Sequence, residues 1–265
     1  MPIHYEDSGG NGTPVLALHG TFGRGLTFAA VAERLAPEFR VIAPDLPGHG
    51  LTAQHREAQG HQDFGRDEFV AAVAELVEQL ELPPVVVIGH SLGGVTAFQL
   101  AARRPELVAA VVVEDVGAVT DASVLPQPVL DVTGWPTRFA SRQAAEQFFA
   151  ATPEPAYFLE SVVERDGGWE LLFDLDDMMA VQHGNAGVWW DDWTAVRRPM
   201  LLLRATDSFL LSAALADEMI RRRPATELVV FDRTGHWIHR EDPDRYTAAV
   251  RAFVERVITS RPPAG

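Results

Sequence analysis

Residues 85–94 read Val-Val-Val-Ile-Gly-His-Ser-Leu-Gly-Gly, and this stretch decides both the fold and the chemistry expected of the chain. The apolar run Val85–Ile88 is typical of a buried strand, and a helical pattern follows directly after the glycines. A turn this tight strains the backbone of Ser91, and glycine at Gly89 and Gly93 removes side chains that would collide there. We therefore expect Ser91 to project its hydroxyl from the sheet edge as a nucleophile.

A serine nucleophile needs a base to take its proton, so a histidine must come from elsewhere in the chain. His236 follows the last apolar run, Leu228–Phe231, and is the predicted general base. His239, three residues further on, is expected to be a surface or supporting histidine. His90 flanks the nucleophile, and its ring is expected to turn away from the reacting centre. The histidines without a comparable placement are His4, His49, His55, His61 and His183.

Acyl transfer also needs donors for the oxyanion of a tetrahedral intermediate, each worth about 3 to 4 kcal/mol. The sequence His19-Gly20-Thr21-Phe22-Gly23 follows the apolar run Val15–Leu18 and would bring bare backbone close to a substrate oxygen. The predicted donors are the backbone amides of Leu92 and of Phe22, with Thr21 as the alternative to Phe22.

Apolar runs and helical patterns alternate along most of the chain. Continuous runs of Val, Ile and Leu indicate strands covered on both faces, as in a parallel sheet. The alternation predicts the α/β class, with a mostly parallel central sheet flanked by helices. The runs are Val15–Leu18, Val41–Ile42, Val85–Ile88, Ala109–Val113, Met200–Leu203 and Leu228–Phe231. The helical patterns are Leu26–Leu35, Asp67–Leu80, Gly93–Arg103 and Ala213–Arg222.

The alternation stops after Gly117 and resumes at Pro199, which indicates an insertion. We divide the chain into a core of residues 1–117 and 198–265 and an inserted helical segment of residues 118–197. This segment holds thirteen acidic and four basic residues and five of the six tryptophans. Most of its aromatic side chains are expected to form a small core, and some to face a pocket. The aromatic residues expected to bind substrate are Trp135, Phe139, Trp189 and Trp190.

Composition excludes several functions. The chain has 265 residues, of which 47% are hydrophobic and 22% charged, as in ordinary folded domains. A net charge of −15 opposes binding to nucleic acid or to an anionic membrane surface. Every basic residue is Arg, and the lack of Lys and Cys excludes Schiff-base chemistry, thiol nucleophiles and zinc–cysteine sites. We expect no metal and no cofactor. We also expect no membrane span and no signal peptide, which indicates a cytoplasmic protein. Its expected state is a monomer or a homodimer.

Taken together, these motifs resemble the α/β-hydrolase fold family, in its small esterase and thioesterase branch. The matching pieces are His19-Gly20, Asp45-Leu46-Pro47-Gly48-His49-Gly50, the turn around Ser91, and Gly235-His236. The resemblance implies that residues 118–197 form a cap and that Asp45 shapes a turn. Serine where dehalogenases and epoxide hydrolases of the family carry aspartate implies an acyl-enzyme intermediate.

The carboxylate that orients His236 is left open, because the resemblance allows it at either of two strand ends. One place is the loop after Met200–Leu203, which contains Asp207. Aligning Ser212 with the small residue that closes this loop in the family puts Ser208, and not Asp207, at the acid position.

The other place is the end of the preceding strand, where Glu114 and Asp115 follow Val113. Asp115 fits that position without adjustment, although many family members carry an aspartate there that only braces a loop. Asp115 is therefore the preferred acid, Asp207 the alternative and Glu114 the least favoured.

The leading interpretation is a serine hydrolase that cleaves an ester or thioester of a small molecule with an apolar acyl or aryl group of modest size. A carbon–carbon bond hydrolase of ring-cleavage diketones is an alternative, and would need cationic groups for a substrate carboxylate. The candidates for those groups are Arg138, Arg142 and Arg204. Lactonase, perhydrolase or acyl-transfer activity would use the same catalytic residues, and a non-catalytic ligand-binding module is the alternative outside enzymes.

Overall fold

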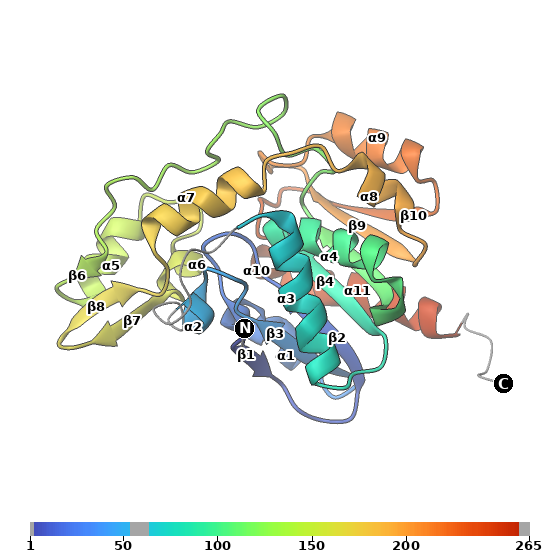
Figure 1. Cartoon of the computed structure of the whole chain (residues 1–265), viewed down its shortest axis with the longest axis horizontal. Helices are drawn as coiled ribbons and strands as arrows, with labels where there is room; N and C mark the ends of the chain where they lie inside the picture. Colours follow the sequence, from blue (N-terminus) through green and yellow to red (C-terminus); the bar gives the residue numbers. More distant parts are fainter. Residues whose placement is uncertain (1–2, 54–63, 260–265) are drawn as a thin grey trace.

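A mostly parallel sheet forms the centre of the computed structural model, which describes residues 3–53 and 64–259, so that His55 and His61 lie outside the described residues. Its strands are β1 (Tyr5–Asp7), β2 (Thr13–Leu18), β3 (Phe39–Pro44), β4 (Val85–His90), β5 (Val108–Glu114), β9 (Met200–Ala205) and β10 (Thr226–Phe231). They lie in the order β1-β3-β2-β4-β5-β9-β10, and β1 alone is antiparallel to its neighbour (Figure 1). The predicted sheet and its six strands are confirmed, whereas the edge strand β1 was not predicted.

Helices cover both faces of this sheet, as its alternating apolar strands require. In β4, Val85 and Val87 face one apolar cluster while Val86 and Ile88 face the other. The first cluster is covered by α3 (Arg66–Gln79), α4 (Leu92–Arg103) and α9 (Ala213–Arg222), and the second by α1 (Ala29–Leu35) and α11 (Pro243–Thr259). The four predicted helices are found within a few residues of their expected bounds, and the C-terminal α11 is an addition.

The inserted segment between β5 and β9 is not purely helical. It contains α5 (Arg142–Phe149), α6 (Pro155–Leu159), α7 (Leu175–Gly184) and α8 (Trp190–Ala195), together with an antiparallel sheet of β6 (Arg138–Phe139), β8 (Gly168–Leu171) and β7 (Val162–Arg165). Figure 1 shows this segment, in green to orange, along one side of the central sheet. The small sheet escapes prediction because its strands have two to four residues, too few for a clear alternating pattern.

Parallel strands bring their carboxyl ends to one edge of a sheet, and loops that follow β2, β4, β5, β9 and β10 meet there. Each of these loops carries a residue that the sequence singles out. None of the helices in the described ranges is both long and apolar enough to cross a membrane.

Candidate active site

Ser91 lies at the turn between β4 and α4, with φ 53° and ψ −118°. A positive φ is uncommon for any residue other than glycine and stores strain. Close packing holds it in place, since a Cβ atom on Gly89 would collide with the carbonyl of Gly93, and one on Gly93 with the carbonyl of Leu18. The Ser91 amide also donates to the Glu114 carbonyl at 3.1 Å. The strained turn expected from the sequence is therefore present.

His236 and Asp115 are joined by a hydrogen bond from His236 Nδ1 to Asp115 Oδ2 of 2.8 Å. His236 is 5% exposed and Asp115 is fully buried. Two further donors fix the carboxylate, the Ala205 amide at 3.1 Å on Oδ1 and the Ser208 hydroxyl on Oδ2. Because Nδ1 carries the proton that is donated to Asp115, the neutral ring keeps Nε2 as an acceptor.

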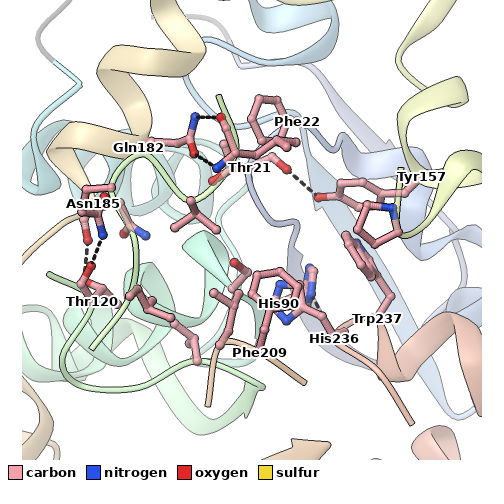
Figure 2. A pocket seen from close by; sticks show the side chains of 18 of the residues that line it. Thr21, Phe22, His90, Thr120, Tyr157, Gln182, Asn185, Phe209, His236 and Trp237 are labelled. Carbon is pink, nitrogen blue, oxygen red and sulfur yellow. Dashed lines mark hydrogen bonds between the residues drawn. The ribbon is translucent and has the colours of Figure 1, made fainter. Parts of the chain in front are cut away.

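Ser91 and His236 line the same pocket, and Figure 2 shows the His236 ring beside it. No hydrogen bond joins their side chains in the described part of the chain. A hydrogen bond between a nucleophile and its base is often long without substrate, and both side chains here face the same cavity.

The two other candidate acids lie elsewhere. Asp207 is exposed, and its carboxylate accepts from the Thr206 hydroxyl at 3.0 Å. The next residue, Ser208, is the one that the alignment of this loop puts at the acid position, and its hydroxyl donates to Asp115. Glu114 is buried but bonded to a different histidine. The structure therefore brings Asp115, and neither alternative, to His236.

Glu114 holds the loop that carries His236. Its Oε1 accepts from both the backbone amide and Nδ1 of His239, at 3.0 and 2.8 Å, and both side chains are buried. His90 lies beside Glu114 in the β4–β5 pairing, and its Nε2 donates to the His236 carbonyl at 3.1 Å. The carboxylates of Asp115 and Glu114 thus hold this loop at His236 and at His239, three residues apart. The sequence predicts His239, three residues after His236, as a surface or supporting histidine. In the structure it is buried and bonded to Glu114.

Glu114, His90 and His239 are also a group of potential metal ligands among the described residues, with ligand atoms within 4.8 Å of one another. His239 Nδ1 and Glu114 Oε1 lie 2.8 Å apart in a hydrogen bond, closer than the roughly 3.4 Å that separates nitrogen or oxygen ligands of a tetrahedral zinc ion. Their hydrogen bonds to each other and to the His236 loop already assign them a supporting role.

The loop after β2 packs directly against the Ser91 turn. A Cβ atom on Gly20 would lie 3.1 Å from Ser91 Cβ, so only glycine allows this approach without a shift. Leu92 begins α4, and the first amides of a helix have no acceptor within it. Backbone donors therefore surround the serine on two sides.

The inserted segment orients the same loop. The Tyr157 hydroxyl donates to the Thr21 carbonyl at 3.1 Å, and the Ser161 hydroxyl to the Phe22 carbonyl at 2.9 Å. Burial raises the pKa of the Tyr157 phenol well above its usual value, which keeps it protonated as a donor. The C=O and N–H of a trans peptide point in opposite directions, so the Phe22 amide points away from Tyr157. The Tyr157 contact therefore fixes the orientation of the Phe22 amide, and the Ser161 contact holds the next peptide of the loop.

Two neutral histidines tie this loop to the one that follows β3. His19 Nδ1 donates to the Gly20 carbonyl at 2.8 Å, and its Nε2 accepts from the Leu46 amide at 2.9 Å. The His49 ring contacts the His19 ring edge-on, with centroids 4.9 Å apart. Burial lowers the pKa of His19 to about 4 and that of His49 to about 3, so both are neutral at pH 7. Asp45 accepts from two backbone amides in this region and shapes the turn.

The pocket at Ser91 is mostly apolar and has a volume of about 140 Å³. An apolar cavity of about 150 Å³ is large enough for a benzene ring, so the space suits an acyl group of modest size. No Asp, Glu, Lys or Arg is among the described residues that line it. Its aromatic side chains are Phe22, Tyr157, Phe158, Phe209 and Trp237.

The aromatic residues expected to bind substrate were Trp135, Phe139, Trp189 and Trp190, and the structure differs, because none of them lines this pocket. Trp135 and Phe139 pack against Phe149, with ring centroids 5.5 and 5.8 Å apart. The Trp189 indole donates to the Thr120 hydroxyl at 2.9 Å, and the Trp190 ring lies 4.1 Å from the Arg222 guanidinium. These side chains form the core and anchors of the inserted segment, which has to bury its own apolar surface.

The three arginines considered for a substrate carboxylate also lie away from the pocket. Arg138 donates to carbonyls of the small sheet, Arg142 to Glu146 and Arg204 to the Leu211 carbonyl. None of the three is a lining residue.

Comparisons with known proteins agree with this fold. The sequence profile of the Alpha/beta hydrolase family matches residues 15–249. The chain is 25% identical over 270 residues to the sn-1-specific diacylglycerol lipase ABHD11 of Mus musculus, covering 96% of this chain and 85% of that protein. It is 27% identical over 253 residues to the 2-(acetamidomethylene)succinate hydrolase of Mesorhizobium japonicum, covering 93% of this chain and 89% of that protein.

A solved structure shares the fold over nearly the whole chain. The crystal structure of E-2-(acetamidomethylene)succinate hydrolase superposes with a TM-score of 0.87 at 24% identity, covering 96% of this chain and 95% of that one.

Acid should destabilise the fold between pH 7 and pH 5. Burial also holds the pKa of His90 well below its usual range, so His19, His49 and His90 stay neutral in the folded protein. In the unfolded chain each takes up a proton near pH 6.5, so the free energy of unfolding falls as the pH drops below that value. The expected loss at pH 5 is about 2 kcal/mol per histidine, measured by urea unfolding at pH 7, 6 and 5.

Two variants make this measurement specific. His49→Gln should reduce by one the number of protons taken up on unfolding, and so lessen the loss of unfolding free energy at pH 5. His183→Gln, at an exposed position, should leave that loss unchanged. Equal stability at pH 7 and pH 5 would contradict the assignment of three neutral buried histidines.

Glu114→Ala should lower the free energy of unfolding by about 3 to 5 kcal/mol, because it leaves the buried His239 without its acceptor. Glu114→Gln, which keeps an acceptor, should lose less. The control is Glu78→Ala, which breaks an exposed ion pair with Arg104 and should change stability little. Urea unfolding measures all three, and equal losses for Glu114→Ala and Glu78→Ala would refute the supporting role.

Proposed function

Because this chain belongs to the alpha/beta hydrolase family, we propose that it is a serine hydrolase that cleaves a carboxylic ester or thioester through an acyl-enzyme intermediate. The observation that carries the proposal is the convergence of Ser91 and His236 on one apolar pocket, with His236 Nδ1 bonded to the buried Asp115. A nucleophile, a base and a group that orients the base are the three parts that acyl transfer requires.

In the proposed mechanism His236 Nε2 takes the proton from Ser91 Oγ while that oxygen attacks the substrate carbonyl carbon. The amides of Leu92 and of Phe22 or Thr21 stabilise the resulting oxyanion, each by about 3 to 4 kcal/mol. His236 then gives its proton to the leaving alcohol or thiol, and a water activated by the same ring releases the acid. Asp115 stabilises the imidazolium and keeps the proton on Nδ1.

We propose further that residues 118–197 act as a cap that limits substrate size. Leu125, Leu130, Tyr157 and Phe158 of this segment line the pocket beside the serine. Their apolar surface favours an uncharged acyl or aryl group held by burial. The mouse relative is named a lipase, which supports ester cleavage by this chain.

The bacterial relative is named for a succinate derivative, and its substrate therefore carries carboxylates. No arginine is among the described residues that line the pocket here, and burying a carboxylate without a paired cation is costly. The same point counts against the hydrolysis of ring-cleavage diketones. An ester or thioester of an uncharged acid is therefore the better candidate, and lactonase and perhydrolase reactions would use the same three side chains.

Fluorophosphonate labelling tests the nucleophile. The wild-type protein should be labelled and should hydrolyse p-nitrophenyl esters or acyl thioesters from a panel graded by chain length. Ser91→Ala should lose both labelling and turnover, while Ser123→Ala, at an exposed serine, should retain both. An unlabelled wild type without turnover would favour the ligand-binding module instead.

Replacing each aspartate tests the acid. Asp115→Asn should lower kcat by roughly ten-thousandfold, because the amide favours the wrong tautomer of His236. Asp207→Asn removes an exposed carboxylate and should behave like wild type. Steady-state kinetics on one ester measures both variants, and near-normal turnover in Asp115→Asn would remove this residue from the mechanism.

A further inference from the structure

The pocket has a polar end that the proposed mechanism does not use. Figure 2 shows Asn185 and Thr120 on one side of the pocket, and His236 and Trp237 on the other. Polar groups placed in a mostly apolar pocket orient the ligand and select its chemistry. The question is which of these groups is free to contact a substrate.

Arg66 fixes the orientation of the Asn185 amide. Its Nη1 donates to Asn185 Oδ1 at 3.1 Å, while Nε donates to Gln99 Oε1 at 2.9 Å and Nη2 to the Thr96 hydroxyl at 2.6 Å. A guanidinium offers only donors, so the amide oxygen must face Arg66 and the amide nitrogen must face away from it. Asn185 Nδ2 makes no hydrogen bond with the described residues, and Asn185 lines the pocket.

The buried charge of Arg66 strengthens this donor. Arg66 is 6% exposed, and burial lowers its pKa to about 9, so it remains a cation at neutral pH. Its hydrogen-bond partners are neutral oxygens, and the nearest counter-charge in this network, Asp192, is reached through Gln99. A cation bonded to an amide oxygen draws electron density from the amide and makes its N–H₂ group a better donor.

The neighbouring polar side chains are already occupied. The Thr120 hydroxyl donates to the Asn185 carbonyl and accepts from the Trp189 indole at 2.9 Å. The Gln182 amide is engaged on both of its ends by the backbone of Leu130, at 2.9 Å each. Gln127, which also lines the pocket, donates from Nε2 to the Thr120 carbonyl at 2.7 Å. Asn185 Nδ2 is therefore an oriented donor without a partner among the described residues.

We propose that Asn185 Nδ2 binds an uncharged carbonyl oxygen, of a ketone or an amide, in the acyl part of the substrate, several atoms from the ester carbonyl. The inference rests on the proposed function, since it assigns substrate chemistry to the same site. A plain hydrocarbon chain leaves this donor desolvated and unpaired, which disfavours the binding of such a chain. A carboxylate would need a cation at the pocket wall, and Arg66 lies behind Asn185 and outside the lining.

Matched p-nitrophenyl esters test this subsite. The hexanoate and heptanoate esters are compared with the 4-oxohexanoate, 5-oxohexanoate and 6-oxoheptanoate esters, which differ from them only by a carbonyl in the chain. For at least one keto ester we expect kcat/KM about tenfold above that of its hydrocarbon match. The half-ester of adipic acid, which carries a carboxylate, should be a poorer substrate than the hexanoate.

The decisive variant is Asn185→Asp, which keeps an oxygen facing Arg66, replaces the donor by an acceptor and adds a negative charge. The keto-to-hydrocarbon ratio should fall to one or below, and Asn185→Leu should lose the preference as well. His183→Gln, an exposed change on the same helix, should keep the wild-type ratio.

Each outcome separates the two proposals. If wild type hydrolyses no ester, the serine hydrolase proposal fails. If it hydrolyses the hydrocarbon esters without any preference for a keto ester, or if Asn185→Asp keeps that preference, the subsite alone is refuted. A preference for the acidic half-ester would overturn the uncharged substrate class.

Discussion

The close backbone packing at the end of β4 is the constraint on which the site depends. Gly89, Gly93 and the carbonyl of Leu18 approach too closely for any side chain, and this packing holds Ser91 at a positive φ. Such strain costs about 1 to 3 kcal/mol and persists only where the surrounding structure enforces it. Here the parallel pairing of β2 with β4 enforces it, and the same pairing brings the loop that contains Gly20 against the serine.

The end of β5 places two carboxylates side by side with different tasks. Asp115 orients His236, and Glu114 holds His239 and, with it, the loop on which His236 lies. This division follows from their geometry, because Glu114 is the last residue of the strand while Asp115 adopts φ 49° beyond it. The buried neutral histidines around them add rigidity at the expense of acid stability. If His236 acts as the proposed base, a ring held in this way loses little freedom when it accepts a proton.

The inserted segment contributes to the site in two ways. Tyr157 and Ser161 bind the carbonyls of Thr21 and Phe22 in the loop after β2, so this segment orients the Phe22 amide, one of the predicted oxyanion donors. Its helix α7 ends at the polar side of the pocket, where Asn185 is held by Arg66 from the core. The aromatic side chains that the composition made prominent serve mainly to hold the segment together. In the proposed mechanism the reacting side chains lie at the strand ends, while the inserted segment supplies much of the pocket lining.

The sequence by itself determined the central strands, the main helices and the position of the Ser91 turn, because apolar periodicity and the placing of glycines are local patterns. Periodicity does not tell whether an aromatic side chain faces a core or a cavity, so the four aromatic residues expected at the pocket lie outside its lining, while Tyr157 and Asn185 are part of it. Only the tertiary structure decided which carboxylate meets His236. Asp115 lies 121 residues from His236 in the chain, and the pairing of β5 with β9 brings it beside Ser208 and within hydrogen-bond reach of His236. The register between β5 and β9 sets the position of Asp115 relative to His236, and no local sequence pattern encodes that register.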